Sequence, residues 1–283
     1  MPTVEPVTTI TCQWGEGPIW WAGSLYFVDI EGRKIHRYTP ESGEIRTWES
    51  GQRLGTIVPR ESGGFVVAGD HGIFLFDEIS GNFTALADPE ADKPDNRFND
   101  GKCSPDGRFF AGTISLIKKT GDAQLYRLDP DLSLHEAFGP VTNSNGIIWS
   151  IDGRKVYYID TPRREVLGFD YENGHFSNMI HVVSTVHIDA SPDGMTMDAE
   201  GNLWIAFCHG GCVACFDVTS GKELRRIDFP CVETTACAFG GDRLKDLYVT
   251  TGVHATKVEP LGGRLFVVRG LGVSGVPAHA FAG

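Results

Sequence analysis

The sequence of 283 residues has no long hydrophobic run and no long stretch with helical periodicity. No apolar segment approaches the roughly 20 residues that a membrane-spanning helix needs. The first residues, MPTVEP, lack the basic and then apolar pattern of a secretory signal. The 3.6-residue period of an amphipathic helix is also missing. We therefore expect a cytoplasmic protein without a membrane partner, built from strands.

Positive charge is scarce. Lys and Arg number 25 against 37 Asp and Glu, which gives a formal net charge of -12. The phosphates of a nucleic acid would repel such a chain, so nucleic acid is excluded as a partner. A negatively charged protein can still concentrate cations where its own field is focused. The charge balance thus leaves small molecules and metal ions as ligands.

Two common catalytic motifs are absent. No G-x-S-x-G segment occurs, so the strand-turn-helix elbow of a serine hydrolase is missing. The nine histidines include no H-E-x-x-H pair, which excludes the helical zinc site of the common metalloproteases. Any hydrolytic chemistry must therefore come from residues brought together by the fold.

The cysteines form no disulfide framework. Their number, seven, is odd, and this suits a reducing compartment. A local group of Cys208, His209, Cys212 and Cys215 suggests zinc, but His209 begins a predicted hairpin turn and the last two cysteines fall on opposite faces of the next strand. We interpret these cysteines, and Cys103, as small buried hydrophobic residues.

Glycine and proline are abundant, with 35 and 15 residues. They separate short strand-like runs roughly every 8 to 12 residues, a spacing typical of all-β sandwiches, barrels and propellers. The sequence Ser104-Pro105-Asp106-Gly107 is one example, with Pro where φ is preset and Gly where φ can be positive. The fold class is therefore all-β.

A repeat selects among these folds. Six copies of one pattern, an oxygen-bearing residue followed by a Gly turn and a strand, recur roughly every 40 to 48 residues, the length of a propeller blade. We predict a six-bladed β-propeller with four-stranded antiparallel blades around a central channel, in one domain over residues 1–283. The ring closes with a strand from residues 4–11. The register residues of the six copies are Glu16, Thr56, Asn99, Asn145, Asp193 and Thr235.

Equivalent positions of a closed ring converge on its axis, so these side chains are expected to meet. Glu16, Asn99, Asn145 and Asp193 would form an oxygen-rich anionic cage without a thiolate. One divalent ion is expected there, with Ca²⁺ favoured and Zn²⁺, Mn²⁺, Mg²⁺ or Fe²⁺ as alternatives. Each residue could instead satisfy backbone groups at a turn. Their recurrence in phase favours the metal site.

Several segments resemble the senescence marker protein/gluconolactonase/regucalcin family, in order and over almost the whole chain. They are residues 15–20 (GEGPIW), 97–102 (RFNDGK), 144–146 (SNG), 158–161 (YIDT), 192–195 (PDGM), 198–204 (DAEGNLW) and 234–241 (TTACAFGG). The resemblance implies a six-bladed propeller that hydrolyses a sugar lactone, such as xylono-, arabinono- or gluconolactone, at one divalent cation. The expected partner is a small-molecule sugar lactone. We expect a monomer, because a closed ring has no free long edge that demands a partner.

The resemblance also assigns roles. Its metal ligands match Glu16, Asn145 and Asp193, and its substrate-contacting pair matches Arg97 and Asn99. This moves Asn99 from the metal cage to the substrate. As a carboxylate beside the metal, Asp193 is the candidate general base for the attacking water. For Arg97 the alternatives are a solvated loop charge or a structural salt bridge.

One departure from the family concerns the substrate. Members that act on gluconolactone-like substrates often carry an acidic residue after Ala-Gly-Thr, whereas here Thr113 is followed by Ile-Ser-Leu-Ile-Lys-Lys, and the next acid is Asp122. The identity of the lactone is therefore open. Two other functions remain as alternatives: a related phosphotriester hydrolase using the same cation, and a calcium-binding propeller without enzymatic activity.

Overall fold

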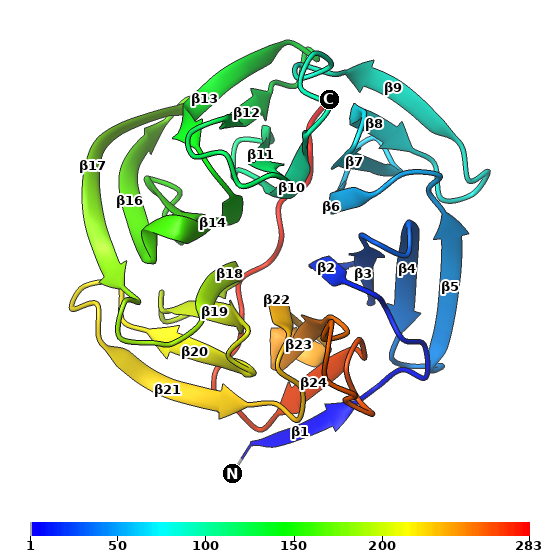
Figure 1. Cartoon of the computed structure of the whole chain (residues 1–283), viewed down its shortest axis with the longest axis vertical. Helices are drawn as coiled ribbons and strands as arrows, with labels where there is room; N and C mark the ends of the chain where they lie inside the picture. Colours follow the sequence, from blue (N-terminus) through cyan, green and yellow to red (C-terminus); the bar gives the residue numbers. More distant parts are fainter. Residues whose placement is uncertain (1) are drawn as a thin grey trace.

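Six four-stranded antiparallel sheets surround a central axis in the computed structural model, which describes residues 2–283 (Figure 1). Each sheet is one blade of a six-bladed β-propeller, as the repeat predicted. Among the described residues, no helix has the length and apolar character needed to cross a bilayer. The two helical segments, η1 (Thr161–Arg163) and η2 (Asp242–Leu244), are single turns between strands.

The first three blades run outward from the axis in chain order. Blade 1 comprises β2 (Gly15–Trp21), β3 (Ser24–Asp29), β4 (Lys34–Thr39) and β5 (Glu44–Glu49). Blade 2 comprises β6 (Leu54–Pro59), β7 (Phe65–Gly69), β8 (Gly72–Phe76) and β9 (Phe83–Ala87). Blade 3 comprises β10 (Asn96–Cys103), β11 (Phe109–Ser115), β12 (Ala123–Leu128) and β13 (Leu134–Val141).

The remaining blades repeat the plan, except that the last one is shared between the two ends of the chain. Blade 4 comprises β14 (Ser144–Trp149), β15 (Lys155–Asp160), β16 (Glu165–Glu172) and β17 (His175–Ser184). Blade 5 comprises β18 (Ser191–Met197), β19 (Leu203–Cys208), β20 (Cys212–Phe216) and β21 (Glu223–Asp228). Blade 6 comprises β22 (Thr234–Gly240), β23 (Asp246–Thr251), β24 (Phe266–Arg269) and β1 (Thr3–Pro6).

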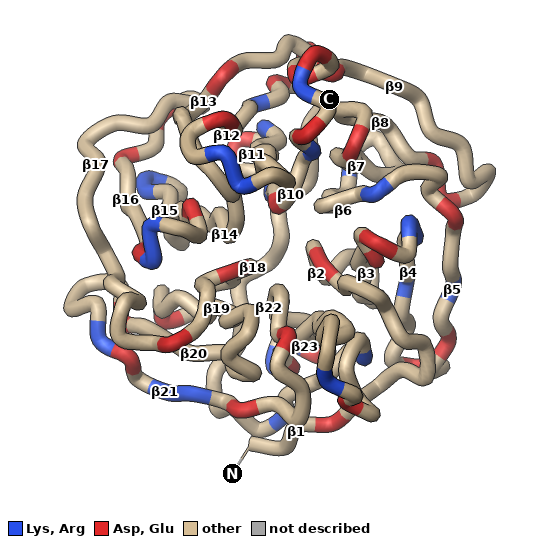
Figure 2. The backbone as a smooth tube through the Cα atoms, viewed as in Figure 1, with Lys and Arg blue, Asp and Glu red and all other residues tan. Residues whose placement is uncertain are grey.

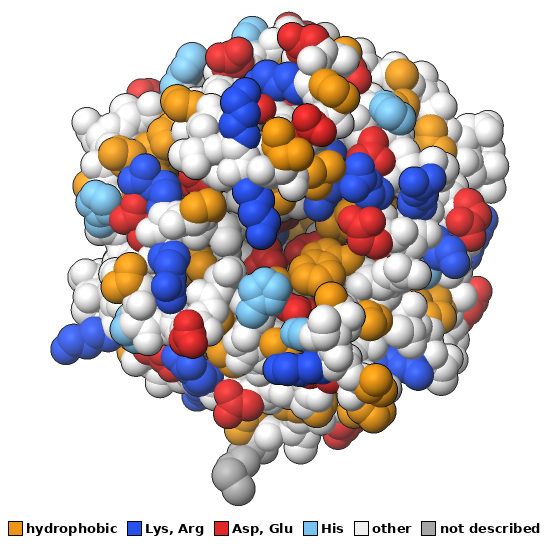
Figure 3. All heavy atoms as spheres, in the orientation of Figure 1, with side chains coloured by type: hydrophobic (Ala, Val, Ile, Leu, Met, Phe, Trp, Pro, Cys, Tyr) orange, Lys and Arg blue, Asp and Glu red, His pale blue; other side chains and the backbone are white. Residues whose placement is uncertain are grey.

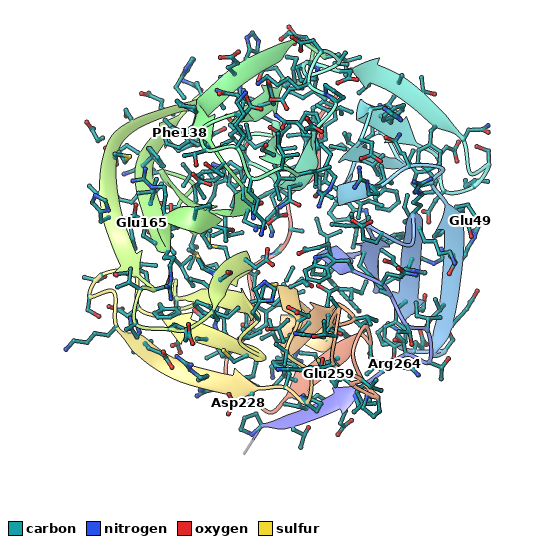
Figure 4. All side chains as sticks on the ribbon, in the orientation of Figure 1. Glu49, Phe138, Glu165, Asp228, Glu259 and Arg264 are labelled. Carbon is teal, nitrogen blue, oxygen red and sulfur yellow. The ribbon has the colours of Figure 1, made fainter. Side chains whose placement is uncertain are left out.

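Burial falls from the axis to the rim of each blade. The second strands β3, β7 and β19 are buried along their whole length, because both faces of a blade pack against its neighbours. Five hydrophobic clusters accordingly join adjacent blades rather than filling one centre. The outermost strands lie at the circumference, where Figure 4 labels Glu49, Phe138 and Asp228. This packing explains why these second strands are apolar along most of their length, without strict alternation.

The two ends of the chain close the ring. β1 pairs antiparallel with β24, with Val4 opposite Val268, so the N-terminal segment supplies the outermost strand of the last blade. The predicted closure is confirmed, although the strand ends at Pro6 and does not extend to residue 11. This pairing joins the two ends of the chain in one blade and so closes the ring.

The C-terminal segment, residues 270–283, crosses the ring behind the face viewed in Figure 1. It bonds to turns between first and second strands of several blades: the amide of Gly275 donates to Leu244 O, and that of Ala282 to Gly107 O. Phe281 is fully buried in the cluster that joins blades 1, 2 and 3. The segment therefore spans the axis on the side opposite the strand starts.

Every inner strand has an irregularity in its pairing at the register residue or directly beside it. In β10 it lies between Phe98 and Gly101, in β14 between Ser144 and Ile147, and in β18 between Pro192 and Met195. An extra residue in one strand interrupts the ladder and turns side chains out of the regular alternation. The bulges therefore determine which side chains face the axis.

Candidate metal centre and substrate cavity

A cavity of about 720 Å³ opens where the inner strands begin. Its lining comes from blades 1, 3, 4 and 5, and it includes all five residues predicted from the sequence: Glu16, Arg97, Asn99, Asn145 and Asp193. Figure 3 shows the hollow at the centre of the face, with acidic side chains at its floor. Figure 2 locates acidic residues on β2 and β18 beside the axis.

Two buried carboxylates, those of Glu16 and Asp193, are the charged groups of this floor. Burial, followed by the charge of Asp100, raises the pKa of Glu16 to about 8. Burial and the charges of Glu16 and Asp100 raise the pKa of Asp193 well above its usual range. Buried charges of one sign are costly without a compensating cation.

Asp100 is a third buried acid that sequence reasoning did not single out. Burial raises its pKa as well, and its Oδ2 has no hydrogen-bond partner within residues 2–283. Its other oxygen accepts from the amide of Gly101 at 2.7 Å. In a regular strand Asp100 and Asn99 would face opposite sides, but the bulge of β10 removes both from that alternation. The bulge could not be read from the sequence.

The side-chain amide of Asn145, which lines the cavity, is oriented by hydrogen bonds. Its Nδ2 donates to Thr161 Oγ1 at 2.9 Å, and that hydroxyl donates to Pro192 O at 2.9 Å. Its Oδ1 accepts from Asn99 Nδ2 at 3.3 Å. Because the nitrogen is already engaged, the oxygen is the atom left to meet a cation. Such outer contacts are what orient metal ligands in proteins.

Arg97 and Asn99 form one unit. The Nη1 group of Arg97 donates to Asn99 Oδ1 and to Phe98 O, each at 2.8 Å, and Asn99 Nδ2 donates to Ser144 O at 2.8 Å. Arg97 is buried, which excludes a solvated loop charge, and its Nε has no partner within the described chain. Burial lowers the pKa of Arg97 to about 10. A fixed guanidinium therefore faces the cavity with donors to spare.

The donor set fits a hard divalent cation. Two carboxylates and one oriented amide oxygen surround the floor, and the buried charge there is negative. Oxygen donors of this kind are the ligands that Ca²⁺ takes in proteins, with water completing the shell. Lys102 offsets part of this negative charge, because its own charge lowers the pKa of Glu16. Its Nζ is positioned by a hydrogen bond that it donates to Met195 O at 2.9 Å.

The segment that departs from the family lies at the cavity. Ile114, Ser115, Lys118 and Thr120 all contribute to its lining. Asp122 does not replace the missing acid, because its carboxylate accepts from Lys119 Nζ at 2.8 Å on the exposed side of the loop. This part of the cavity wall therefore presents apolar, hydroxyl and cationic side chains in place of an acidic one.

The cysteines divide into two groups. Cys212 and Cys215 are buried in two different hydrophobic clusters, and Cys103 is buried in a third, so their predicted packing role is confirmed. Cys208 and His209, by contrast, line the cavity.

Comparison with known proteins places this geometry in a family. Residues 14–253 match the family described as SMP-30/Gluconolactonase/LRE-like region. The chain is similar to regucalcin of Danio rerio, 40% identical over 280 residues that cover 95% of each protein. It is also similar to a luciferin-regenerating enzyme (TM-score 0.93, 28% identity, all of both chains) and to a calcium-binding protein, regucalcin, from Agrobacterium tumefaciens. The latter has TM-score 0.92 and 26% identity over 98% of this chain and 96% of its own. The chain belongs to the SMP-30/gluconolactonase/LRE-like family.

Proposed function

We propose that this chain is a sugar lactonase that depends on a divalent cation, with Ca²⁺ as the preferred ion. The observation that carries the proposal is the cluster of buried acids, Glu16 and Asp193, at the floor of a cavity that a small sugar can enter. Family membership supports hydrolysis of a sugar lactone in general. The calcium-binding description of the Agrobacterium relative supports the choice of metal.

Glu16, Asn145 and Asp193 would hold the cation. When bound there, it supplies polarisation of the lactone carbonyl and acidification of a water molecule. Asp193 takes the proton of the attacking water as general base, a role worth about 10² to 10⁴ in rate. Asn145 keeps its oxygen toward the cation through Thr161.

Arg97 and Asn99 hold the sugar. The guanidinium is fixed by Phe98 O and Asn99 Oδ1, so it presents its remaining donors in one orientation to ring or hydroxyl oxygens. Lys118 and Thr120 at the mouth replace an acidic side chain and favour lactones whose distal oxygens accept hydrogen bonds. The sugar therefore contacts blade 3 while its carbonyl faces blades 1, 4 and 5.

The test is acid release, followed in a pH-stat, from xylono-, arabinono-, glucono- and galactonolactone and from one phosphotriester. Calcium-loaded protein is expected to hydrolyse at least one lactone far above the Asp193→Ala background and above its rate with the phosphotriester. Preference for the phosphotriester would reassign the substrate class. Calcium binding without turnover of any ester would reduce the protein to a calcium-binding propeller.

A further inference from the structure

A second group of metal-binding side chains lies on the cavity wall, apart from the oxygen-rich floor. It consists of Cys208 at the end of β19, His209 in the following turn, and Glu233 just before β22 of the next blade. One ligand atom from each residue lies within 4.8 Å of the others. His209 and Glu233 lie far apart in the sequence and come into contact only because blades 5 and 6 pack side by side.

The contacts centre on the Glu233 carboxylate. Its Oε2 lies 3.2 Å from Cys208 Sγ and 2.8 Å from His209 Nδ1, and the Cys208 thiol lies 3.8 Å from His209 Nε2. A tetrahedral zinc ion with Zn–S near 2.3 Å and Zn–N near 2.0 Å requires ligand separations of about 3.3 to 3.6 Å. Glu233 Oε2 and Cys208 Sγ, 3.2 Å apart, already lie close to this separation. The two contacts of His209 use different ring nitrogens, so its exposed side chain must rotate to form the site.

Burial shows that the group is built into the fold. Cys208 and Glu233 are buried, whereas the His209 side chain is exposed toward the cavity mouth. The ion-pair contacts of Glu233 within residues 2–283 are with histidines, His209 and His254, and His254 Nε2 is 3.8 Å from Oε1. A buried carboxylate without a Lys or Arg partner calls for another source of positive charge.

A thiol, an imidazole and a carboxylate are also the groups found together in sites where a cysteine acts as nucleophile. The electrostatic surroundings of Cys208 disfavour a nucleophilic role. Burial, together with the charges of Asp193 and Glu233, raises the pKa of the Cys208 thiol, whereas a nucleophilic cysteine needs surroundings that lower it. A cation at this position would satisfy the thiolate and the carboxylate together.

We propose that Cys208, His209 and Glu233 form a second metal site, for Zn²⁺ or a similar borderline ion, with its fourth position open to the cavity. Thiolate and imidazole ligands select such ions and are poor ligands for Ca²⁺. The ligand set thus differs in kind from the oxygen donors of Glu16, Asn145 and Asp193. This site does not depend on the proposed lactonase activity.

The test uses the full chain, stripped by chelator, saturated with Ca²⁺ and then titrated with Co²⁺. The expected result is one equivalent of bound Co²⁺ with a thiolate-to-cobalt charge-transfer band in the near ultraviolet, which Zn²⁺ removes. Cys208→Ser and Glu233→Gln should abolish the band. Cys215→Ser, a buried cysteine of the next strand, and His181→Ala, an exposed histidine paired with Glu165, should keep it.

A wild-type protein without the band, or a band that persists in Cys208→Ser, would overturn the site. If Cys208→Ser fails to fold, His209→Asn replaces it, because Asn tolerates the left-handed φ of 67° at this position. Rapid alkylation of Cys208 that is equally fast with and without Zn²⁺ would likewise overturn the site and favour a nucleophile. Asp193→Asn, which should lose Ca²⁺ but retain the cobalt band, separates this proposal from the lactonase.

Discussion

The six register positions of the ring fall into two kinds. Four carry Glu16, Asn99, Asn145 and Asp193, which line the cavity, and two carry threonines, which do not. Thr56 Oγ1 donates to Gly101 O of the next blade at 2.8 Å, and Thr235 Oγ1 donates to Gly15 O at 2.5 Å. The same place in the repeat therefore either lines the cavity or ties neighbouring blades together.

The backbone separates the two kinds as well. In the four cavity-lining blades two residues of the inner strand stand opposite one residue of the second strand. In the threonine blades a single residue, Gly55 or Thr235, is inserted between consecutive pairs. A larger irregularity gives more freedom to re-aim a side chain. The cavity-lining register residues thus occur with the wider bulges, and the threonines occur with the narrower ones.

The largest effect is expected at a ligand position. Asp193→Asn keeps the shape of the side chain but removes the carboxylate that we propose as base and metal ligand. We expect lactone turnover to fall about 10² to 10⁴-fold, with loss of calcium binding by calorimetry. Thr56→Val, at the equivalent place in blade 2, is the matched control and should retain both. Equal losses in the two variants would erase the distinction between the positions.

A smaller effect is expected at Arg97, the proposed substrate contact. Arg97→Lys keeps the charge but loses the Nη1 group that donates to Asn99 Oδ1 and Phe98 O, together with the other guanidinium donors. We expect kcat/KM to fall about 10- to 100-fold, mainly through KM, because a positioning contact is lost. Calcium affinity should not change, and Arg226→Lys on the outer strand β21 serves as control. If Arg97→Lys lowered only the affinity for calcium, Arg97 would instead be assigned to the metal site.

The pH dependence of stability tests the buried acids. Glu16 has its pKa raised from 4.5 to about 8, so between these values the native state keeps a proton that the unfolded chain releases. The metal-free protein should therefore lose stability as pH rises through this range, with Tm falling by several degrees. Ca²⁺ should reverse the fall. Glu16→Gln should flatten the metal-free profile, and a steeper fall in that variant would contradict the assignment.

The smallest effect is expected at the threonine positions. Thr56→Val or Thr235→Val leaves a buried carbonyl of the neighbouring blade without its donor, at a cost of about 1 to 3 kcal/mol. The urea midpoint should decrease while kcat and calcium affinity stay at wild-type values. Thr47→Val on the rim strand β5 is a control for loss of the hydroxyl of an exposed threonine. A reduced kcat in Thr235→Val would show that this blade also contributes to the site.

The sequence predicted the ring because glycine turns and register residues recur in each blade, and such local repetition does not depend on distant contacts. It also placed Glu16, Asn99, Asn145 and Asp193 together at the cavity, since equivalent positions of a ring converge. Thr56 and Thr235, expected to meet them, do not line it, and Arg97 was identified only from the family resemblance. It could not predict that Asp100 is buried with Asn99, because strand alternation fails at the bulge. Nor could it predict the meeting of Cys208 with Glu233, which depends on packing between blades 5 and 6.

The C-terminal segment has a consequence for how ligands reach the cavity. Residues 270–283 bridge the far side, from Leu244 to Gly107, whereas Lys118 and His209 line the cavity where the inner strands begin. For the proposed lactonase, the lactone would then enter and the open-chain acid would leave on the same side of the ring. Competitive inhibition by the product is the expected consequence.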